Sequence, residues 1–314
     1  MVRRPRFAGL SGLTTLTPVG AFEPQISFVT TADDRVLEVA VAGPVDGTPL
    51  FFHHGTPGAA ALFEPNVEMG AERGLRHIAY SRPGYGGSTR MEGRTVADCA
   101  ADVAAIADAM QLERFHTLGG SGGGPHSLAC ARLLGNRVIS AATIASCAPM
   151  DPESLDWTAG MGKENLAEFA AVRAGDIALK EYLEGEVQAM AGTTGEQVVA
   201  ALGDLISDVD RRALSGDFGD HVARQLARAL SSGVSGWLDD DKAFFSDWGF
   251  DLAPGVVPVS IWHGSQDRFV PISHGEWLAA HIAGARVYLR PHDGHLSLTV
   301  DSYGRILDDL LTSD

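Results

Sequence analysis

The sequence is poor in features that mark several classes of protein. It has only 3 cysteines in 314 residues, an odd number without metal-site spacing, so we expect no disulfide framework. No run of about 18 apolar residues occurs, which argues against a membrane-spanning helix. The segment 7–20 is broken by glycine, proline and threonine and lacks the apolar run of a signal peptide. We therefore expect a soluble, cytoplasmic protein.

Basic residues are also scarce. The chain has 24 Lys and Arg against 40 Asp and Glu, which gives a formal net charge of −16 and a pI near 5.0. Nucleic acids and anionic membranes bind clustered basic side chains, so neither is an expected partner. The imbalance is concentrated between Asp151 and Pro254, where 20 acidic residues face 8 basic ones. This shift in composition suggests that a separate unit begins near residue 151.

The first half of the chain alternates between strand and helix patterns. Residues 25–31 and 35–42 alternate in polarity, as in an antiparallel hairpin. Short apolar runs typical of strands covered on both faces follow at 49–55, 76–82, 115–119 and 137–146. Helices are expected from Thr95, with Asp98 in the capping-box position, and at 127–134. This rhythm predicts an α/β fold with a doubly wound, mostly parallel sheet.

The rhythm stops after Pro149 and resumes near residue 257. The stretch between is helical and acidic, with no convincing strand. Strands are then expected at 257–264 and 285–289, helices at 274–282 and from Leu296 to Leu310. We therefore predict a core made of residues 1–150 and 251–314, with residues 151–250 inserted as a helical cap.

The sequence Gly119-Gly120-Ser121-Gly122-Gly123 lies between a strand and a helix. A sharp turn there strains the backbone at the central serine and tolerates only small neighbours two positions away. The serine hydroxyl would stand at the tip of the turn as a nucleophile, beside the Gly122 amide as an oxyanion donor. No Gly-Lys-Ser/Thr ending follows, so this is not a phosphate-binding loop.

The groups that could activate Ser121 follow other strands. Asp267 and His295 each come directly after a strand, so both should reach the sheet edge that carries the serine. The imidazole would act as the base and the carboxylate would orient it. The amide of Thr56, in a Pro- and Gly-rich loop after a strand, is the second candidate oxyanion donor. Asp151 is the alternative acid.

Other histidines suit these roles less well. His126 lies too close to the serine in sequence to act as its base and is expected to pack or line a pocket, while His292 directly follows a proline at a strand end. His53, His54 and His263 read as strand-end residues. We see no convincing metal-ligand constellation and expect neither a metal nor a cofactor.

Several motifs resemble those of the α/β-hydrolase fold superfamily, in their usual order along the chain. They are His54-Gly55-Thr56-Pro57-Gly58, Arg82-Pro83-Gly84-Tyr85-Gly86-Gly87-Ser88, Gly119 to Gly123, Gly264 to Asp267, and Gly294-His295. The chain departs from the resemblance at Ser81, where many members have Asp, and at Gly120, where a larger side chain is commoner. Members that open epoxides or displace halide use an Asp nucleophile, so Ser121 implies the serine branch and acyl transfer.

The resemblance and the residues together predict a serine hydrolase that acts through an acyl-enzyme intermediate. Its partner would be a small acyl substrate, most directly a carboxylic ester or lactone. Two alternatives stay open: an aminopeptidase similar to proline iminopeptidases, whose acidic cap would hold a substrate ammonium, and a ligand-binding or signalling module that retains the three residues. The oligomeric state and the substrate are left open.

Overall fold

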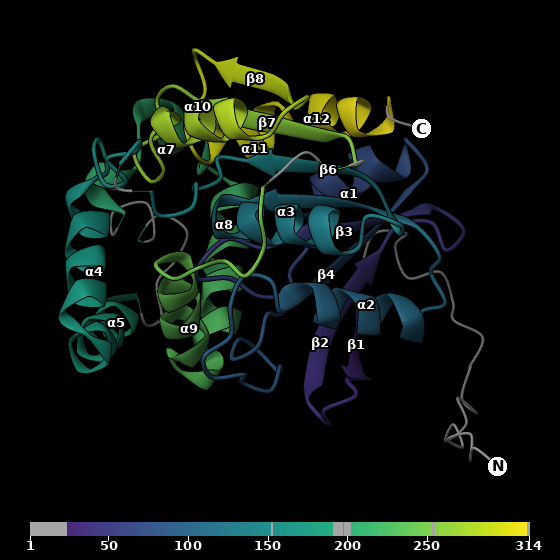
Figure 1. Cartoon of the computed structure of the whole chain (residues 1–314), viewed down its shortest axis with the longest axis horizontal. Coiled ribbons are helices and arrows are strands. Elements are labelled where there is room, and N and C mark those ends of the chain that lie inside the picture. The colour runs from purple at the N-terminus through teal and green to yellow at the C-terminus, as the bar shows by residue number, and fades with distance from the viewer. Residues whose placement is uncertain are drawn as a thin grey trace.

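The computed structural model describes residues 24–151, 153–190, 197, 202–252, 255 and 257–312. These residues form an eight-stranded sheet with the strand order β1-β2-β4-β3-β5-β6-β7-β8 (Figure 1). The strands are β1 Gln25–Thr30, β2 Val36–Ala42, β3 Thr48–His53, β4 Leu75–Tyr80, β5 Phe115–Gly120, β6 Val138–Ile144, β7 Val259–Gly264 and β8 Arg286–Arg290. Strand β2 pairs antiparallel with β1 and β4, and the other pairs are parallel. The predicted fold class is confirmed.

Helices cover both faces of the sheet. One face carries α1 Glu64–Ala71 and α12 Tyr303–Leu311, and the other carries α2 Cys99–Ala109, α3 Gly124–Leu133 and α10 Ile272–His281 (Figure 1). Successive residues of a strand point to opposite faces, so the buried pair Leu50 and Phe51 contributes to two different core clusters. Covering both faces explains why the central strands are continuous apolar runs.

The described residues between β6 and β7 contain helices and no strand. They are α4 Lys163–Ala174, α5 Asp176–Met190, α7 Asp208–Ala213, α8 Asp217–Ala229 and α9 Ser235–Phe244. Helices α4 and α5 lie at the outer edge of the molecule, beyond α9 (Figure 1). The helical character expected of this stretch is confirmed for the described residues, while 152, 191–196 and 198–201 lie outside them.

Several helix boundaries differ from the sequence prediction, among them those of α10, which spans Ile272–His281 rather than 274–282. Helix α2 begins at Cys99 rather than Thr95, because the amides of residues 99–101 bond to carbonyls three residues back and make the preceding segment a tight turn. The Asp98 carboxylate accepts hydrogen bonds from both the amide and the hydroxyl of Thr95 in this turn. Helix α3 begins at Gly124 rather than 127. The single terminal helix is two, α11 Ser297–Asp301 and α12, which meet at Ser302.

Two expectations from composition can be compared with the structure. The three cysteines are free and buried. Among the described residues, no helix has both the length and the apolar character needed to cross a membrane.

Candidate active site

The predicted nucleophile Ser121 stands at a strained turn between β5 and α3. Its φ angle is 52°, in the left-handed region that residues other than glycine rarely adopt. A Cβ atom at Gly119 would overlap the carbonyl oxygen of Gly123, and one at Gly123 would overlap that of His53. By contrast, a Cβ at Gly120 would meet nothing within 4 Å. The turn therefore needs glycine on both sides of Ser121 at a spacing of two, whereas Gly120 could be a larger residue.

The loop after β3 lies directly against this turn. A Cβ built on Gly55 would lie 3.4 Å from the Cβ of Ser121, and one built on Gly122 would overlap the Thr56 hydroxyl. The backbone amide of Thr56 donates no hydrogen bond to any other described group. The structure thus brings Thr56 and Gly122 together beside Ser121, as the two predicted oxyanion donors require.

Asp267 and His295 form a buried pair. His295 Nδ1 lies 2.7 Å from Asp267 Oδ2, and the two residues are 6% and 5% exposed. The other carboxylate oxygen, Oδ1, accepts hydrogen bonds from the amides of Phe269 at 2.9 Å and Val270 at 2.8 Å. The Phe269 ring stacks on the imidazole with centroids 4.5 Å apart. These contacts fix the ring plane and leave Nε2 without a hydrogen bond to any other described residue.

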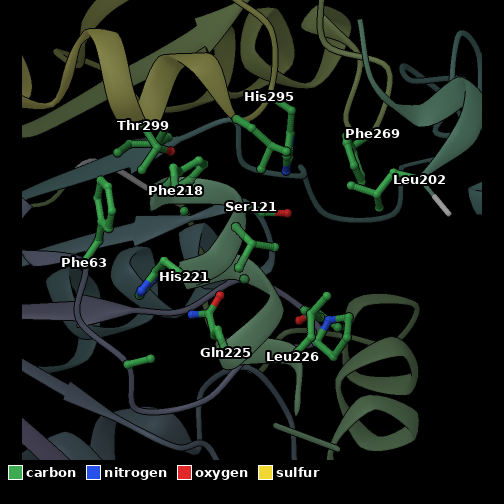
Figure 2. Close-up of a pocket in the computed structure, with 18 of the residues that line it drawn as sticks. Phe63, Ser121, Leu202, Phe218, His221, Gln225, Leu226, Phe269, His295 and Thr299 are labelled. Atoms are coloured by element: carbon green, nitrogen blue, oxygen red, sulfur yellow. The ribbon is translucent and has the colours of Figure 1, made fainter. Parts of the chain in front are cut away.

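Ser121 and His295 line the same cavity (Figure 2). No hydrogen bond joins them among the described residues, and in unliganded enzymes such bonds are often long. The alternative acid Asp151 does not contact His295. It accepts hydrogen bonds from the Ser154 hydroxyl and the Trp277 indole instead.

The buried histidines considered from sequence bond to other groups, although His263 Nε2 also lies 3.6 Å from Asp267 Oδ2. His126 is buried, and its Nδ1 lies 2.8 Å from the Gly122 carbonyl oxygen. His53 contacts the Thr117 hydroxyl at 3.0 Å and His263 contacts the Val270 carbonyl at 2.7 Å. His292 is exposed.

A second carboxylate, which the sequence prediction missed, holds the backbone around His295. Asp210 of α7 is fully buried. Its Oδ1 accepts hydrogen bonds from the amides of Leu296 at 2.8 Å and Ser297 at 2.9 Å, and its Oδ2 accepts from the amide of His295 at 3.1 Å. A Cβ at Gly294 would overlap this carboxylate, so glycine is needed for the close approach. Asp210 thereby fastens α7 to the loop that carries the imidazole.

These two carboxylates set the electrostatics of His295. Burial alone would lower the pKa of this imidazole, but the adjacent Asp267 and the nearby Asp210 raise it above its usual 6.5.

The sequence does contain a local signal at Ser207 and Asp210, since Ser-x-x-Asp marks a helix start, and the Ser207 side chain does cap α7. Nothing local indicates that the acid binds a loop 85 residues away.

A buried ion cluster supports the Thr56 loop. Asp240 of α9 is fully buried and contacts Arg82 at 2.6 Å and Arg94 at 2.7 Å. It also accepts a hydrogen bond from the Thr56 hydroxyl at 2.6 Å, and the Arg82 guanidinium donates to two backbone carbonyls in the segment 54–55. Burial would raise the pKa of Asp240, but the two guanidinium groups hold it well below its usual range. The cluster links α9 to the loop of the predicted oxyanion donor.

The cavity beside Ser121 has a volume of about 240 Å³. Its described lining contains no Lys or Arg, whereas Glu164, Glu168 and Glu186 all contribute. Glu168 accepts a hydrogen bond from the Trp237 indole at 2.6 Å. Burial and the charge of Glu186 raise the pKa of Glu168 to about 7, although hydrogen bonds from Trp237 and Asp241 oppose this rise.

Known proteins share this architecture. A non-heme chloroperoxidase of Streptomyces lividans is 29% identical over 268 residues, which cover 85% of this chain and 91% of that protein. The 3-oxoadipate enol-lactonase 1 of Acinetobacter baylyi is 24% identical over 260 residues, or 81% and 84% of the two chains. The solved esterase RhEst1 of a Rhodococcus species matches with a TM-score of 0.64 at 20% identity, over 92% of this chain and 99% of its own.

The relatives support hydrolase activity. The family model of the alpha/beta hydrolase fold matches residues 48–301, which include Thr56, Ser121, Asp267 and His295. Because the match spans well over half of the chain, this protein belongs to the alpha/beta hydrolase fold family.

Proposed function

We propose that the protein is a serine hydrolase that cleaves a small uncharged or cationic acyl substrate, most directly a carboxylic ester or lactone, through an acyl-enzyme. The observation that carries this proposal is the buried His295–Asp267 pair, whose His295 lines the same cavity as the strained Ser121. The three side chains come from separate loops at one sheet edge, an arrangement suited to nucleophilic catalysis.

In the first step, Ser121 Oγ attacks the carbonyl carbon while its proton passes to His295 Nε2. The oxygen of the tetrahedral intermediate is bound by the amides of Thr56 and Gly122, and Asp267 stabilises the imidazolium. The C–O bond to the alcohol then breaks, and the alcohol leaves with the proton from Nε2. A water molecule then attacks the acyl-enzyme in the same way, with its proton passing to His295 Nε2, and the carboxylic acid is released as Ser121 Oγ recovers the proton.

Charge in the cavity supports the substrate class. A substrate carboxylate would enter without a Lys or Arg partner among the described lining residues and would face three glutamates. Burying an unpaired charge is costly, so anionic acyl groups should bind poorly. The names of the relatives include an esterase and an enol-lactonase, which is consistent with ester cleavage.

We also propose that residues 151–250 act as a cap over a core made of residues 1–150 and 251–314. Support comes from cavity-lining residues on four helices of this stretch, which are Glu164, Tyr182, Phe218 and Trp237. Such a cap excludes water from the reaction and shapes the substrate site.

An aminopeptidase is the second candidate. The carboxylates of Glu164, Glu168 and Glu186 could hold a substrate ammonium, whereas the raised pKa of Glu168 weakens its share of that charge near neutral pH. Aminoacyl p-nitroanilides and their N-acetylated counterparts separate the two functions. An aminopeptidase cleaves only the free amines, and an esterase prefers p-nitrophenyl acetate to both.

Hydrolysis of p-nitrophenyl acetate by the wild type and by Ser121→Ala tests the proposal. We expect the variant to fold with an unchanged circular dichroism spectrum and to lose about four or more orders of magnitude in kcat. Equal turnover by both proteins would refute the role of Ser121. Absence of turnover in the wild type across esters, lactones and anilides would favour a ligand-binding module instead.

A further inference from the structure

The cavity beside Ser121 extends toward the sheet face covered by α1 and α12. Figure 2 shows Phe63 and Thr299 on one side of Ser121 and Leu202 and Phe269 on the other. We use the term inner end for the part of the lining contributed by β3, α1, β4, β6 and α12, which is Phe52, Asn66, Val67, His77, Ile144 and Tyr303. Half of these residues are apolar and half carry uncharged polar groups.

Asn66 is the most unusual member of the inner end. The residue is only 7% exposed, and its Oδ1 is buried without a hydrogen-bond partner. Its side chain makes no hydrogen bond to any described residue. Buried carboxamides are normally paired, because an unpaired one loses its hydrogen bonds to water without replacement. A carboxamide left unpaired in the wall of a substrate cavity is therefore suited to pairing with a ligand.

The other polar groups of the inner end are His77 and Tyr303, each 1% exposed. His77 Nε2 lies 2.9 Å from the Tyr303 hydroxyl, and His77 Nδ1 is buried without a partner. Burial lowers the pKa of His77 to about 4, so the imidazole is neutral at ordinary pH. His77 and Tyr303 thus bond to each other and add no charge, which leaves Asn66 as the polar side chain of the inner end without a described partner.

We propose that the inner end is a subsite for an uncharged hydrogen-bonding group of the substrate, such as a ketone, hydroxyl or amide, with Asn66 as its main partner. The apolar side chains of Phe52, Val67 and Ile144 would pack against the hydrocarbon chain that joins this group to the ester. A carboxylate is disfavoured, because no Lys or Arg is among the described lining residues. This inference rests on the proposed ester hydrolysis and specifies its substrate class.

The test compares keto esters with plain esters of the same chain length. The p-nitrophenyl esters of 4-oxopentanoic, 5-oxohexanoic and 6-oxoheptanoic acids are paired with those of pentanoic, hexanoic and heptanoic acids. A second series places the ketone in the alcohol half, as acetates of hydroxyketones paired with acetates of simple alcohols. The measured quantity is the ratio of kcat/KM for the keto ester to that for its plain partner.

The wild type should favour the keto ester by about tenfold or more at one chain length in one series, since sites built to hydrogen-bond a group discriminate against analogues without it. Asn66→Leu, which is nearly isosteric, should bring this ratio close to one. Its melting temperature should equal or exceed that of the wild type, because the substitution removes an unpaired buried amide. Gln225→Leu, at another cavity-lining position, should leave the ratio unchanged.

Two results would overturn the inference: a ratio near one for the wild type throughout both series, or an Asn66→Leu variant that slows keto and plain esters equally. Failure of the proposed function would look different. In that case ester cleavage would be absent from the wild type, or would persist in Ser121→Ala.

Discussion

Replacing Asp210 with Asn tests how α7 supports His295. The two carboxylate oxygens of Asp210 divide their bonds: Oδ1 accepts from the amides of Leu296 and Ser297, and Oδ2 accepts from the amide of His295 and the Ser207 hydroxyl. An asparagine keeps only one acceptor oxygen. Even if that oxygen takes the Oδ1 position, its NH2 group faces the His295 amide, and two donors oppose each other.

The expected loss of stability follows from the number of acceptor oxygens that the substitution removes. At least one buried backbone amide loses its acceptor, which costs about 1–3 kcal/mol. For a protein of this size, each kcal/mol lowers Tm by roughly 2–4 °C. The effect on catalysis depends on how far the loop shifts, since misplacing a catalytic group by about 1 Å can reduce turnover about 100-fold.

The pH dependence should change as well. In the proposed mechanism His295 works as a base in its neutral form, so we expect activity to fall as pH drops through its pKa. The charge of Asp210 is one of the causes that raise this pKa, and its removal should therefore extend activity to lower pH. The assay measures kcat/KM for p-nitrophenyl acetate between about pH 5 and 9. The fall of kcat/KM on the acidic side of this profile reports the pKa of the base in the free enzyme.

Asp208→Asn is the matched control, because it removes the same charge from an exposed position on the same helix. We expect it to resemble the wild type in Tm, in kcat and in the position of the acidic limb. If Asp210→Asn matches Asp208→Asn in all three quantities, the support of His295 by Asp210 is refuted.

Three further predictions concern the remaining acids. Asp267→Asn should depress kcat by up to about 10⁴-fold, because it holds the wrong imidazole tautomer, while Asp151→Asn should change kcat little. A larger loss of kcat in Asp151→Asn than in Asp267→Asn would assign the orienting role to Asp151 instead. Asp240→Asn should destabilise the fold by about 3–5 kcal/mol in urea unfolding, because two buried guanidinium groups lose their carboxylate, and a loss below about 1 kcal/mol would contradict this. An anionic ester should be a poor substrate that improves with added salt, because salt screens the charge of the cavity glutamates over the Debye length, about 8 Å at physiological ionic strength. A neutral ester should show little salt dependence, and Glu186→Gln should weaken the salt dependence of the anionic ester. Parallel salt profiles for the two esters would discard the electrostatic argument.

The sequence predicted features that depend on local sterics. Glycine at 119 and 123 is required by the close approach of carbonyl oxygens to the turn at Ser121, so the motif itself carries the geometry. The strand order of an α/β fold likewise places the residues after β7 and β8 at the same edge. This explains why Asp267 and His295 could be chosen before their contact was known.

The supporting acids could not be predicted in this way. Asp210 binds amides 85 to 87 residues away, and Asp240 binds Arg82 at a separation of 158 residues. From sequence, both belong to the acidic stretch between Asp151 and Pro254, and nothing in the sequence separates them from its other acids. In the structure, Asp210 and Asp239 to Asp241 are buried instead. Composition therefore revealed the excess charge, but only long-range packing shows which carboxylates are solvated.

The start of α2 shows a smaller error, whose origin is local rather than long-range. Thr95 and Asp98 have the residue types of a capping box, yet their mutual hydrogen bonds close a turn that precedes α2. The pattern identified the interaction correctly and misplaced the helix start, because both arrangements use the same donor and acceptor.

Covalent labelling tests the central claim, that Ser121 is the nucleophile, most directly. The protein is treated with a fluorophosphonate, digested, and mapped by mass spectrometry. We predict a single adduct on Ser121, with labelling lost in Ser121→Ala and slowed in Asp267→Asn. An adduct on another residue, or labelling of Ser121→Ala at the wild-type rate, would contradict the account.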